Sequence, residues 1–252
     1  MSAPRVAIVT GSSSGIGEGI ARALAADGFT VVVNSAASVD AGERLAAQLP
    51  GASYVQADIA DPSDAVRLVE TAVERHGRLD LLVNNAGISR TVPHADLDAI
   101  TAEDWHRILG VNVVGTWQVS VAALEVMEPG GQIINITSVG GSRPLGSSIP
   151  YSVSKAALDH LTRLLAKAVG PDVRVNAIAP GPLETRMTSD SLAARAARTA
   201  AMTPLGRLGQ PSDVAAMVLA LTKAPFVTGE VIHVDGGINL VTHFDAPRND
   251  DA

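Results

Sequence analysis

The chain has 252 residues, of which 46% are hydrophobic and 18% are charged, so it can bury a sizeable core. Its formal net charge of -7 argues against a nucleic-acid surface, because binding to phosphate backbones needs a concentrated positive field. It has no cysteine, which excludes disulfides, thiolate metal sites and a cysteine nucleophile. No apolar run reaches the length of a membrane span or of a secretory signal, so we expect a cytoplasmic protein without membrane or nucleic-acid partners.

Short β-branched runs alternate with longer Ala- and Leu-rich stretches of helical period, which is typical of βαβ units and a parallel sheet. We expect strands near residues 5–10, 30–34, 53–56, 80–84, 131–137, 173–178 and 230–235. We expect helices near residues 15–27, 40–48, 62–76, 102–127, 150–169, 189–200 and 211–222. The pattern predicts an α/β, doubly wound Rossmann fold, in which residues 1–252 form one domain with a seven-stranded parallel sheet and helices on both faces.

A glycine-rich turn follows the first predicted strand and opens the first helix. Its residues, which we expect to bind a dinucleotide cofactor, are Gly11, Ser12, Ser13, Ser14, Gly15, Ile16 and Gly17. Gly11 permits a tight turn, Gly15 lets the backbone approach a phosphate, and Gly17 lets the helix pack near the strand. The free N–H groups and the positive helix end would then face the pyrophosphate.

The end of the second strand bears on the choice between NADP and NAD. In dinucleotide folds an acidic residue at this point commonly bonds the adenosine ribose of NAD, but here Asn34 and Ser35 stand there and the first acid is Asp40. This favours NADP, with Asn34 and Ser35 as hydrogen-bonding partners of the 2′-phosphate, and leaves NAD open because no Arg or Lys is close in sequence. Past the third strand, Asp58 and Ile59 are expected beside the adenine.

Three further segments resemble the short-chain dehydrogenase/reductase family when they are taken together with the glycine turn. They are Asn84-Asn85-Ala86-Gly87, Ser138, and Tyr151-Ser152-Val153-Ser154-Lys155. Their order and separation match the family from about residue 5 to residue 240, and the resemblance extends to 3-oxoacyl-(acyl-carrier-protein) reductase-like and glucose dehydrogenase-like members. The resemblance implies a nicotinamide-dependent oxidoreductase that acts on ketones or secondary alcohols.

The chemistry explains why this family needs these residues. Reduction of a carbonyl by hydride generates an alkoxide that must receive a proton, and a tyrosine with an ordinary pKa of about 10 needs a nearby positive charge to exchange protons near neutral pH. Lys155 lies four residues after Tyr151, on the same helix face, and its ammonium would favour the phenolate. Ser138 would donate a hydrogen bond to the substrate oxygen. By the resemblance, Lys155 also bonds the nicotinamide ribose and Asn112 holds a water that relays protons.

The resemblance assigns further cofactor contacts to two loops. Asn84, Ala86 and Gly87 would brace the cofactor from the far side of the cleft, with the Asn84 amide tying adjacent strands together. The loop after the sixth strand would contact the nicotinamide through Pro180, Gly181, Leu183 and Thr185. The six histidines show no ligand-like spacing, so no metal site is expected.

Residues 186–207 are expected to form a mobile lid over the substrate pocket, and residues 241–252 a polar tail. An apolar wall for the substrate is expected from Val139, Gly140, Ile149, Pro182, Leu183, Met187 and Met202. Arg90 and Arg143 are expected to attract an anionic group. The strand end Val234-Asp235-Gly236-Gly237 and the helix segment Ala156-Ala157 match surfaces that pack in homotetramers and homodimers of the family.

These features favour an NADP(H)-dependent carbonyl reductase, acting for example on 3-oxoacyl thioesters. An NAD-dependent dehydrogenase of a sugar, steroid or other secondary alcohol is the alternative within the enzyme class. A non-catalytic protein that senses dinucleotides is the alternative from another class, and the presence of Ser138, Tyr151 and Lys155 argues against it.

Overall fold

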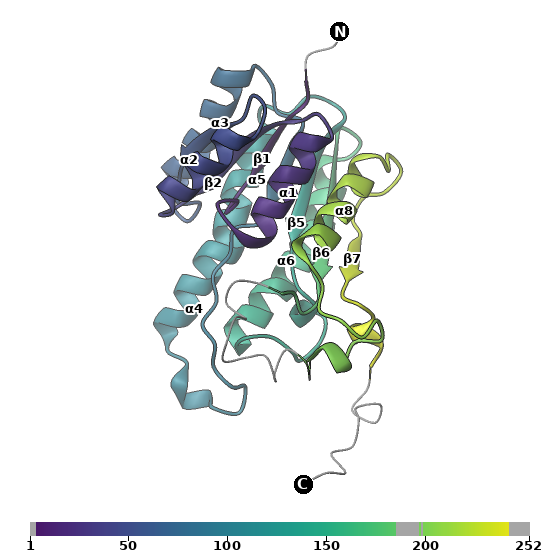
Figure 1. The fold of residues 1–252 in the computed structure, drawn as a ribbon. Helices are drawn as coiled ribbons and strands as arrows, with labels where there is room; N and C mark the ends of the chain where they lie inside the picture. Colours follow the sequence, from purple (N-terminus) through teal and green to yellow (C-terminus); the bar gives the residue numbers. More distant parts are fainter. Residues whose placement is uncertain (1–3, 185–196, 198, 242–252) are drawn as a thin grey trace.

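The computed structural model describes residues 4–184, 197 and 199–241, and a parallel sheet forms the centre of this described part (Figure 1). The strands are β1 Val6–Val9, β2 Thr30–Ser35, β3 Ser53–Gln56, β4 Leu81–Asn84, β5 Gly131–Ile136, β6 Val173–Pro180 and β7 Val231–Val234. They lie in the order β3-β2-β1-β4-β5-β6-β7, and each neighbouring pair is parallel. The structure therefore confirms the predicted doubly wound fold, and the ends of the strands differ from the prediction by two residues at most.

Helices cover both faces of the sheet (Figure 1). The helices are α1 Gly15–Ala26, α2 Val39–Gln48, α3 Pro62–His76, α4 Ala102–Leu109, α5 Thr116–Leu124, α6 Ile149–Val169 and α8 Pro211–Thr222. Helices α1, α2 and α8 pack on one face, while α3, α5 and α6 pack on the other. The predicted helix at 189–200 and the predicted lid at 186–207 fall largely outside the described residues, and so does the tail beyond Val241.

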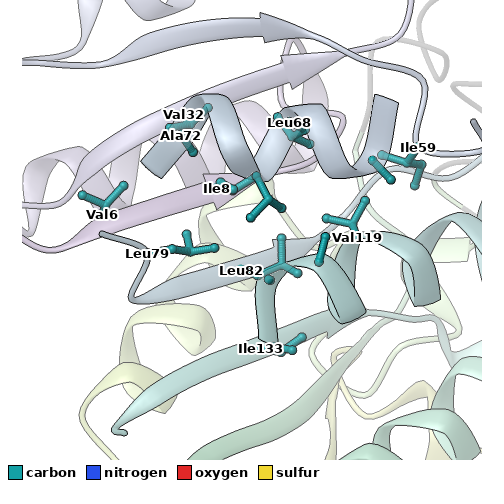
Figure 2. Close-up of a cluster of buried hydrophobic side chains, with 14 of the residues drawn as sticks. Val6, Ile8, Val32, Ile59, Leu68, Ala72, Leu79, Leu82, Val119 and Ile133 are labelled. Carbon is teal, nitrogen blue, oxygen red and sulfur yellow. The ribbon is translucent and has the colours of Figure 1, made fainter. Parts of the chain in front are cut away.

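Alternating side chains on the strands supply both cores, because successive residues of a strand point to opposite faces. In β1, Val6 and Ile8 join the cluster under α3 and α5, while Ala7 and Val9 join the cluster under α1 and α8. Figure 2 shows the first cluster, in which Ile8 lies close to Leu68 of α3 and Leu82 of β4. Both faces of the strand are apolar for this reason, as in other sheets that helices cover on both sides.

The long predicted helix at 102–127 forms as three joined segments. Between α4 and α5 the backbone is π-helical over η2 Gly110–Gly115, and this segment carries Asn112. Such wide turns recur at functional sites because they turn a side chain away from the regular helical position. The combined helix Ala102–Leu124 is long and apolar enough to cross a membrane, but Ile108, Val119 and Ala123 are buried against the protein itself. Its apolar character is therefore accounted for by the core.

The strand order reverses at β1, whose neighbours are β2 and β4. In open α/β sheets the ligand crevice lies beyond the carboxyl ends of the strands at this point. The segments that follow β1, β2, β3 and β4 therefore meet at one edge of the sheet, where the candidate site is found.

Candidate active site

The glycine turn after β1 has the backbone that its sequence predicts. Gly11 and Gly15 both have φ of +60°, a conformation that other residues rarely adopt. A Cβ atom at Gly11 would come within 2.8 Å of the Ala86 Cα, so the turn lies directly against the segment after β4. A Cβ at Gly17 would come within 2.6 Å of the Gly11 carbonyl oxygen, so the start of α1 packs on the turn itself.

Two residues to which the sequence analysis assigned no role, Thr10 and Asn85, hold this turn to the segment after β4. The Thr10 hydroxyl accepts hydrogen bonds from the Asn85 and Ala86 N–H groups, both at 3.0 Å. The Asn85 amide donates to the carbonyls of Thr10 and Gly11, again at 3.0 Å. Thr10 and Asn85 are polar residues at the ends of β1 and β4, and this pattern could have suggested their contact. The sequence does not show, however, that these two strands are neighbours.

A cavity of about 500 Å³ opens between these segments. Its walls come from the turn, the ends of β2, β3 and β4, and helix α4. They include Gly11, Asn34, Ser35, Ala36, Ala37, Ser38, Ala57, Asp58, Ile59, Asn85, Ala86, Gly87, Ile88, Arg107 and Val111. Seven of the predicted cofactor residues thus line one hollow: Gly11, Asn34, Ser35, Asp58, Ile59, Ala86 and Gly87.

Asn34 lines this cavity but its side chain is already fully hydrogen-bonded. Its Oδ1 accepts from the Gly11 N–H, and its amide donates to the carbonyls of Val55 and Ala57. Ser12 is similarly engaged, since its hydroxyl donates to the Val9 carbonyl and accepts from the Asn34 N–H. The prediction that the Asn34 side chain bonds a 2′-phosphate is therefore wrong. Both side chains instead fix the turn to β2 and β3.

The turn and cavity fit a dinucleotide. The space beyond Gly15 is open, with no atom within 4 Å of the position a Cβ would take. The N-cap residue Ser14 makes no side-chain hydrogen bond to the first turn of α1, so the N–H groups there are free for a ligand. A pyrophosphate at this helix end would receive those N–H groups together with the positive end of the helix dipole.

On the far side of the sheet edge, the structure brings Ser138, Tyr151 and Lys155 together. Ser138 ends the loop after β5, and Tyr151 and Lys155 lie on the first two turns of α6. The Ser138 side chain lies beside Tyr151, close enough to lower the pKa of its phenol. The Lys155 Nζ lies 5.6 Å from the centre of the Tyr151 ring and donates to the Ile136 carbonyl at 2.9 Å. This arrangement places a phenol and a hydroxyl side by side, with a cation beneath the ring.

The protonation of Tyr151 differs from the prediction that Lys155 would favour the phenolate. Burial raises the pKa of Tyr151 above its ordinary value of 10, and the neighbouring Ser138 side chain lowers it only in part. Burial also lowers the pKa of Lys155 to about 8, while the neighbouring Asp159 raises it. Burial is the larger of the two effects on Tyr151, so the phenol is favoured over the phenolate in the cofactor-free protein. Tyr151 is therefore set up as a proton donor.

Asn112 and Asn84 are buried in hydrogen-bond networks behind these groups. The Asn112 Oδ1 accepts from the Ile88 N–H, and its amide donates to the Ile88 carbonyl and the Ser154 hydroxyl. The Asn84 amide donates to Ser120 and to the Asn135 Oδ1, which ties β4 to β5 as predicted. Both asparagines thus fix the segments that carry Gly87 and Lys155.

The loop after β6, which was predicted to contact the nicotinamide, packs closely on the segment at the end of β7. A Cβ at Gly181 would come within 2.6 Å of the Asp235 Cα, and the Gly181 N–H donates to the Val234 carbonyl. Leu183 forms a bridge with Gly209. Pro180 ends β6. Thr185 and Met187 lie outside the described residues, so only the start of this loop can be placed.

Neither of the two arginines expected to attract an anion is free to do so. Arg90 is paired with Asp104, and the Arg143 guanidinium donates to the carbonyls of Ile238 and Asn239. The arginine that does face the cavity is Arg107, which the sequence analysis missed. Its guanidinium has no hydrogen-bond or ion-pair partner among the described residues. Arg107 lies four residues before Val111, which also lines the cavity, so the two share one face of the helix. Given the place of Val111, this spacing could have identified Arg107 from the sequence.

Comparisons with known proteins agree with this geometry. The model of a family described as enoyl-(acyl carrier protein) reductase matches residues 11–239. The chain belongs to the short-chain dehydrogenase/reductase family. It is therefore an oxidoreductase, and the expected family and enzyme class are confirmed.

Relatives and solved structures cover nearly the whole chain. A protein of the granaticin polyketide synthase of Streptomyces violaceoruber, assigned as ketoacyl reductase 2, is 56% identical over 94% of this chain and 96% of its own length. The 3-oxoacyl-(acyl-carrier-protein) reductase of Thermotoga maritima is 37% identical over 93% and 97%. A short-chain dehydrogenase from Burkholderia cenocepacia, solved in complex with NADP, is 34% identical over 93% and 98%, with a TM-score of 0.86.

Proposed function

We propose that this protein is an NADP(H)-dependent reductase of 3-oxoacyl groups carried as thioesters. The observation that carries the proposal is that Tyr151 and Lys155 of α6 lie next to the cavity, since a Cβ at the cavity residue Gly87 would come within 3.5 Å of the Lys155 Nζ. The ketoacyl and 3-oxoacyl reductases among the relatives support the substrate class. The NADP complex of a structural neighbour supports the cofactor.

Each side chain has a defined part in this reaction. The nicotinamide cofactor, when bound, supplies the hydride. The Ser138 hydroxyl donates a hydrogen bond to the substrate carbonyl oxygen and orients it. Tyr151 donates its phenolic proton to the same oxygen as negative charge develops there. The Lys155 ammonium stabilises the phenolate that remains and bonds the cofactor ribose. Asn112 holds the backbone around Ile88, against which the site is built.

The end of β2 supports NADP over NAD. The residues that line the cavity there are Ser35, Ala36, Ala37 and Ser38, and none of them is acidic. A carboxylate at this point would bond the ribose of NAD and repel a 2′-phosphate. The Ser35 hydroxyl bonds the Tyr54 hydroxyl at 2.8 Å, and its proton is available to a phosphate when Tyr54 is the donor of that bond. Arg107 supplies a cation to the same cavity.

Replacing Arg107 by Gln is expected to raise the KM for NADPH about tenfold and to leave the KM for NADH unchanged, because a charge-assisted hydrogen bond to the 2′-phosphate is lost. Steady-state kinetics with both cofactors measure the two values. Arg22→Gln is a matched control, since Arg22 is an exposed arginine of α1 that pairs with Glu18 and does not line the cavity. An equal rise in the KM for NADH would show that Arg107 contacts a part of the cofactor that NADH and NADPH share, and not the 2′-phosphate.

The proposed activity is tested by following NADPH and NADH oxidation with a short 3-oxoacyl thioester, a sugar, a steroid ketone and simple ketones. We expect the highest kcat/KM for the 3-oxoacyl thioester with NADPH. A strong preference for NADH would refute the assigned cofactor. Oxidation of sugars or other secondary alcohols at higher kcat/KM than 3-oxoacyl reduction would refute the substrate class.

The assembly and the cellular setting extend the same proposal. We infer that residues 1–252 act as one catalytic domain in the cytoplasm, with copies that associate as homodimers or homotetramers. Exposed apolar side chains on two helices support self-association: Val114 and Trp117 near the start of α5, and Val153 and Leu164 on α6. Leu205 and Leu240, near the edge strand β7, form a second exposed apolar area. Two separate apolar areas are what a tetramer built from two kinds of dimer contact requires.

A further inference from the structure

A buried carboxyl group lies one helical turn beyond Lys155. Asp159 follows Lys155 by four residues on α6, so the two side chains share one face of the helix. Asp159 is 6% exposed and Lys155 is 4% exposed. Charged side chains are rarely buried to this degree unless they interact with an opposite charge. The burial of Asp159 next to Lys155 is not explained by the roles of Tyr151 and Ser138.

The loop that carries Ser138 seals this pair from water. A Cβ at Gly141 would come within 2.7 Å of the Asp159 Oδ2 and 2.9 Å of the Lys155 carbonyl carbon. The loop backbone therefore rests directly on α6, against the Asp159 carboxyl group and the backbone of Lys155. The Asp159 Oδ1 is buried as well and has no hydrogen-bond partner among the described residues. An unpaired buried carboxylate oxygen is costly, and without water its charge acts strongly on its neighbours.

The groups that face Asp159 come from three elements. On α6 they are Lys155 and Arg163, on β7 His233, and just after β5 the uncharged Thr137, whose hydroxyl donates to the Ile178 carbonyl. Arg163 and His233 are exposed at the surface, so their charges are screened by solvent. Lys155 is the buried cation of the group, and its ammonium also lies near the Tyr151 ring, the Ile136 carbonyl and Gly87, which carry no charge. Asp159 is thus the anion that acts on Lys155.

We propose that Asp159 is a positioning residue that keeps the buried Lys155 ammonium protonated at the pH at which the enzyme works. The proposal rests on the reductase function proposed above, in which the ammonium stabilises the Tyr151 phenolate and holds the cofactor ribose. Burial and Asp159 act on the Lys155 pKa in opposite directions, and burial is the larger effect. Without the carboxylate, Lys155 loses its proton at a lower pH.

The test is the pH dependence of kcat/KM for NADPH-dependent reduction of a 3-oxoacyl thioester by Asp159→Asn and Asp159→Ala. We expect the alkaline limb of the profile to move to lower pH by about one unit, with rates near those of the wild type on the acidic side. Asp159→Asn keeps the side-chain volume, and Asp159→Ala removes the carboxyl group without steric demand, so either variant that folds decides the question. Asp172→Asn is the control, because it makes the same change in net charge at an exposed position after α6.

The outcomes separate this proposal from the reductase function. A profile that keeps its alkaline limb, or that falls by one factor at every pH, would assign Asp159 a purely structural role and overturn the proposal. If the wild type itself reduces no substrate, the reductase function fails, and the pH dependence of NADPH binding, followed by its fluorescence, becomes the readout. Because the ammonium binds the cofactor ribose, the binding curves of the variants should show the same shift, and unshifted curves would overturn the role of Asp159.

Discussion

Replacing Tyr151 by Phe is expected to lower kcat for ketone reduction by a factor of about 10² to 10⁴, which is the usual contribution of a positioned general acid. Phe keeps the ring that lies next to the Lys155 ammonium and removes only the hydroxyl on the side of Ser138. The dissociation constant of NADPH should change little, because the glycine turn and the cavity beyond it are untouched. Single-turnover kinetics at saturating cofactor measure the loss in the chemical step.

Tyr54, the other tyrosine of the chain, allows a control in which the same Tyr→Phe substitution is made away from the proposed proton donor. Tyr54 lies on β3, and its hydroxyl bonds Ser35 at the other end of the site. Tyr54→Phe deletes the same atom, but kcat should stay close to the wild-type value because this hydroxyl does not reach the substrate. Wild-type kcat in the Tyr151→Phe variant would show that another group delivers the proton.

Replacing Lys155 by Met is expected to abolish reduction and at the same time to change how stability depends on pH. A folded-state pKa of about 8, below the ordinary lysine value of 10.5, means that the charged form is disfavoured in the folded protein. This cost is fully present below pH 8 and disappears as the pH rises through 10.5, because the folded state then binds no fewer protons than the unfolded state. The shift corresponds to about 3 kcal/mol.

Urea denaturation of the cofactor-free proteins over this pH range measures the effect. The free energy of unfolding of the wild type should rise by about 3 kcal/mol relative to the Met variant between pH 8 and a pH above 10.5. Titrating groups far from Lys155 are common to both proteins and cancel in the difference. Parallel curves for the two proteins would mean that Lys155 has an ordinary pKa and is not desolvated in the fold.

Much of the site could be predicted from the sequence because its parts are local. The turn from Gly11 to Gly17 depends on positive φ values and close approach within a few residues, which glycine alone satisfies. The pairing of Tyr151 with Lys155 follows from helical spacing. The β-branched runs that alternate with helical periods define the parallel sheet, and parallel strands bring their carboxyl ends to one edge.

Other properties depend on contacts between segments far apart in the chain. Asn34 was expected to bind phosphate, but the pairing of β2 with β3 brings the Val55 and Ala57 carbonyls to its amide. Arg107 faces the cavity because α4 crosses behind the ends of β2 and β4. Neither could be anticipated from neighbours in sequence.

The sequence by itself determined the fold and the dinucleotide turn, since both depend on local periodicity or backbone freedom, and its resemblance to the family indicated Ser138, Tyr151 and Lys155. Only the tertiary structure decided the protonation of Tyr151 and Lys155 and the burial of Asp159. Protonation depends on how much water and which charges surround a group, and packing of the Ser138 loop on α6 sets both.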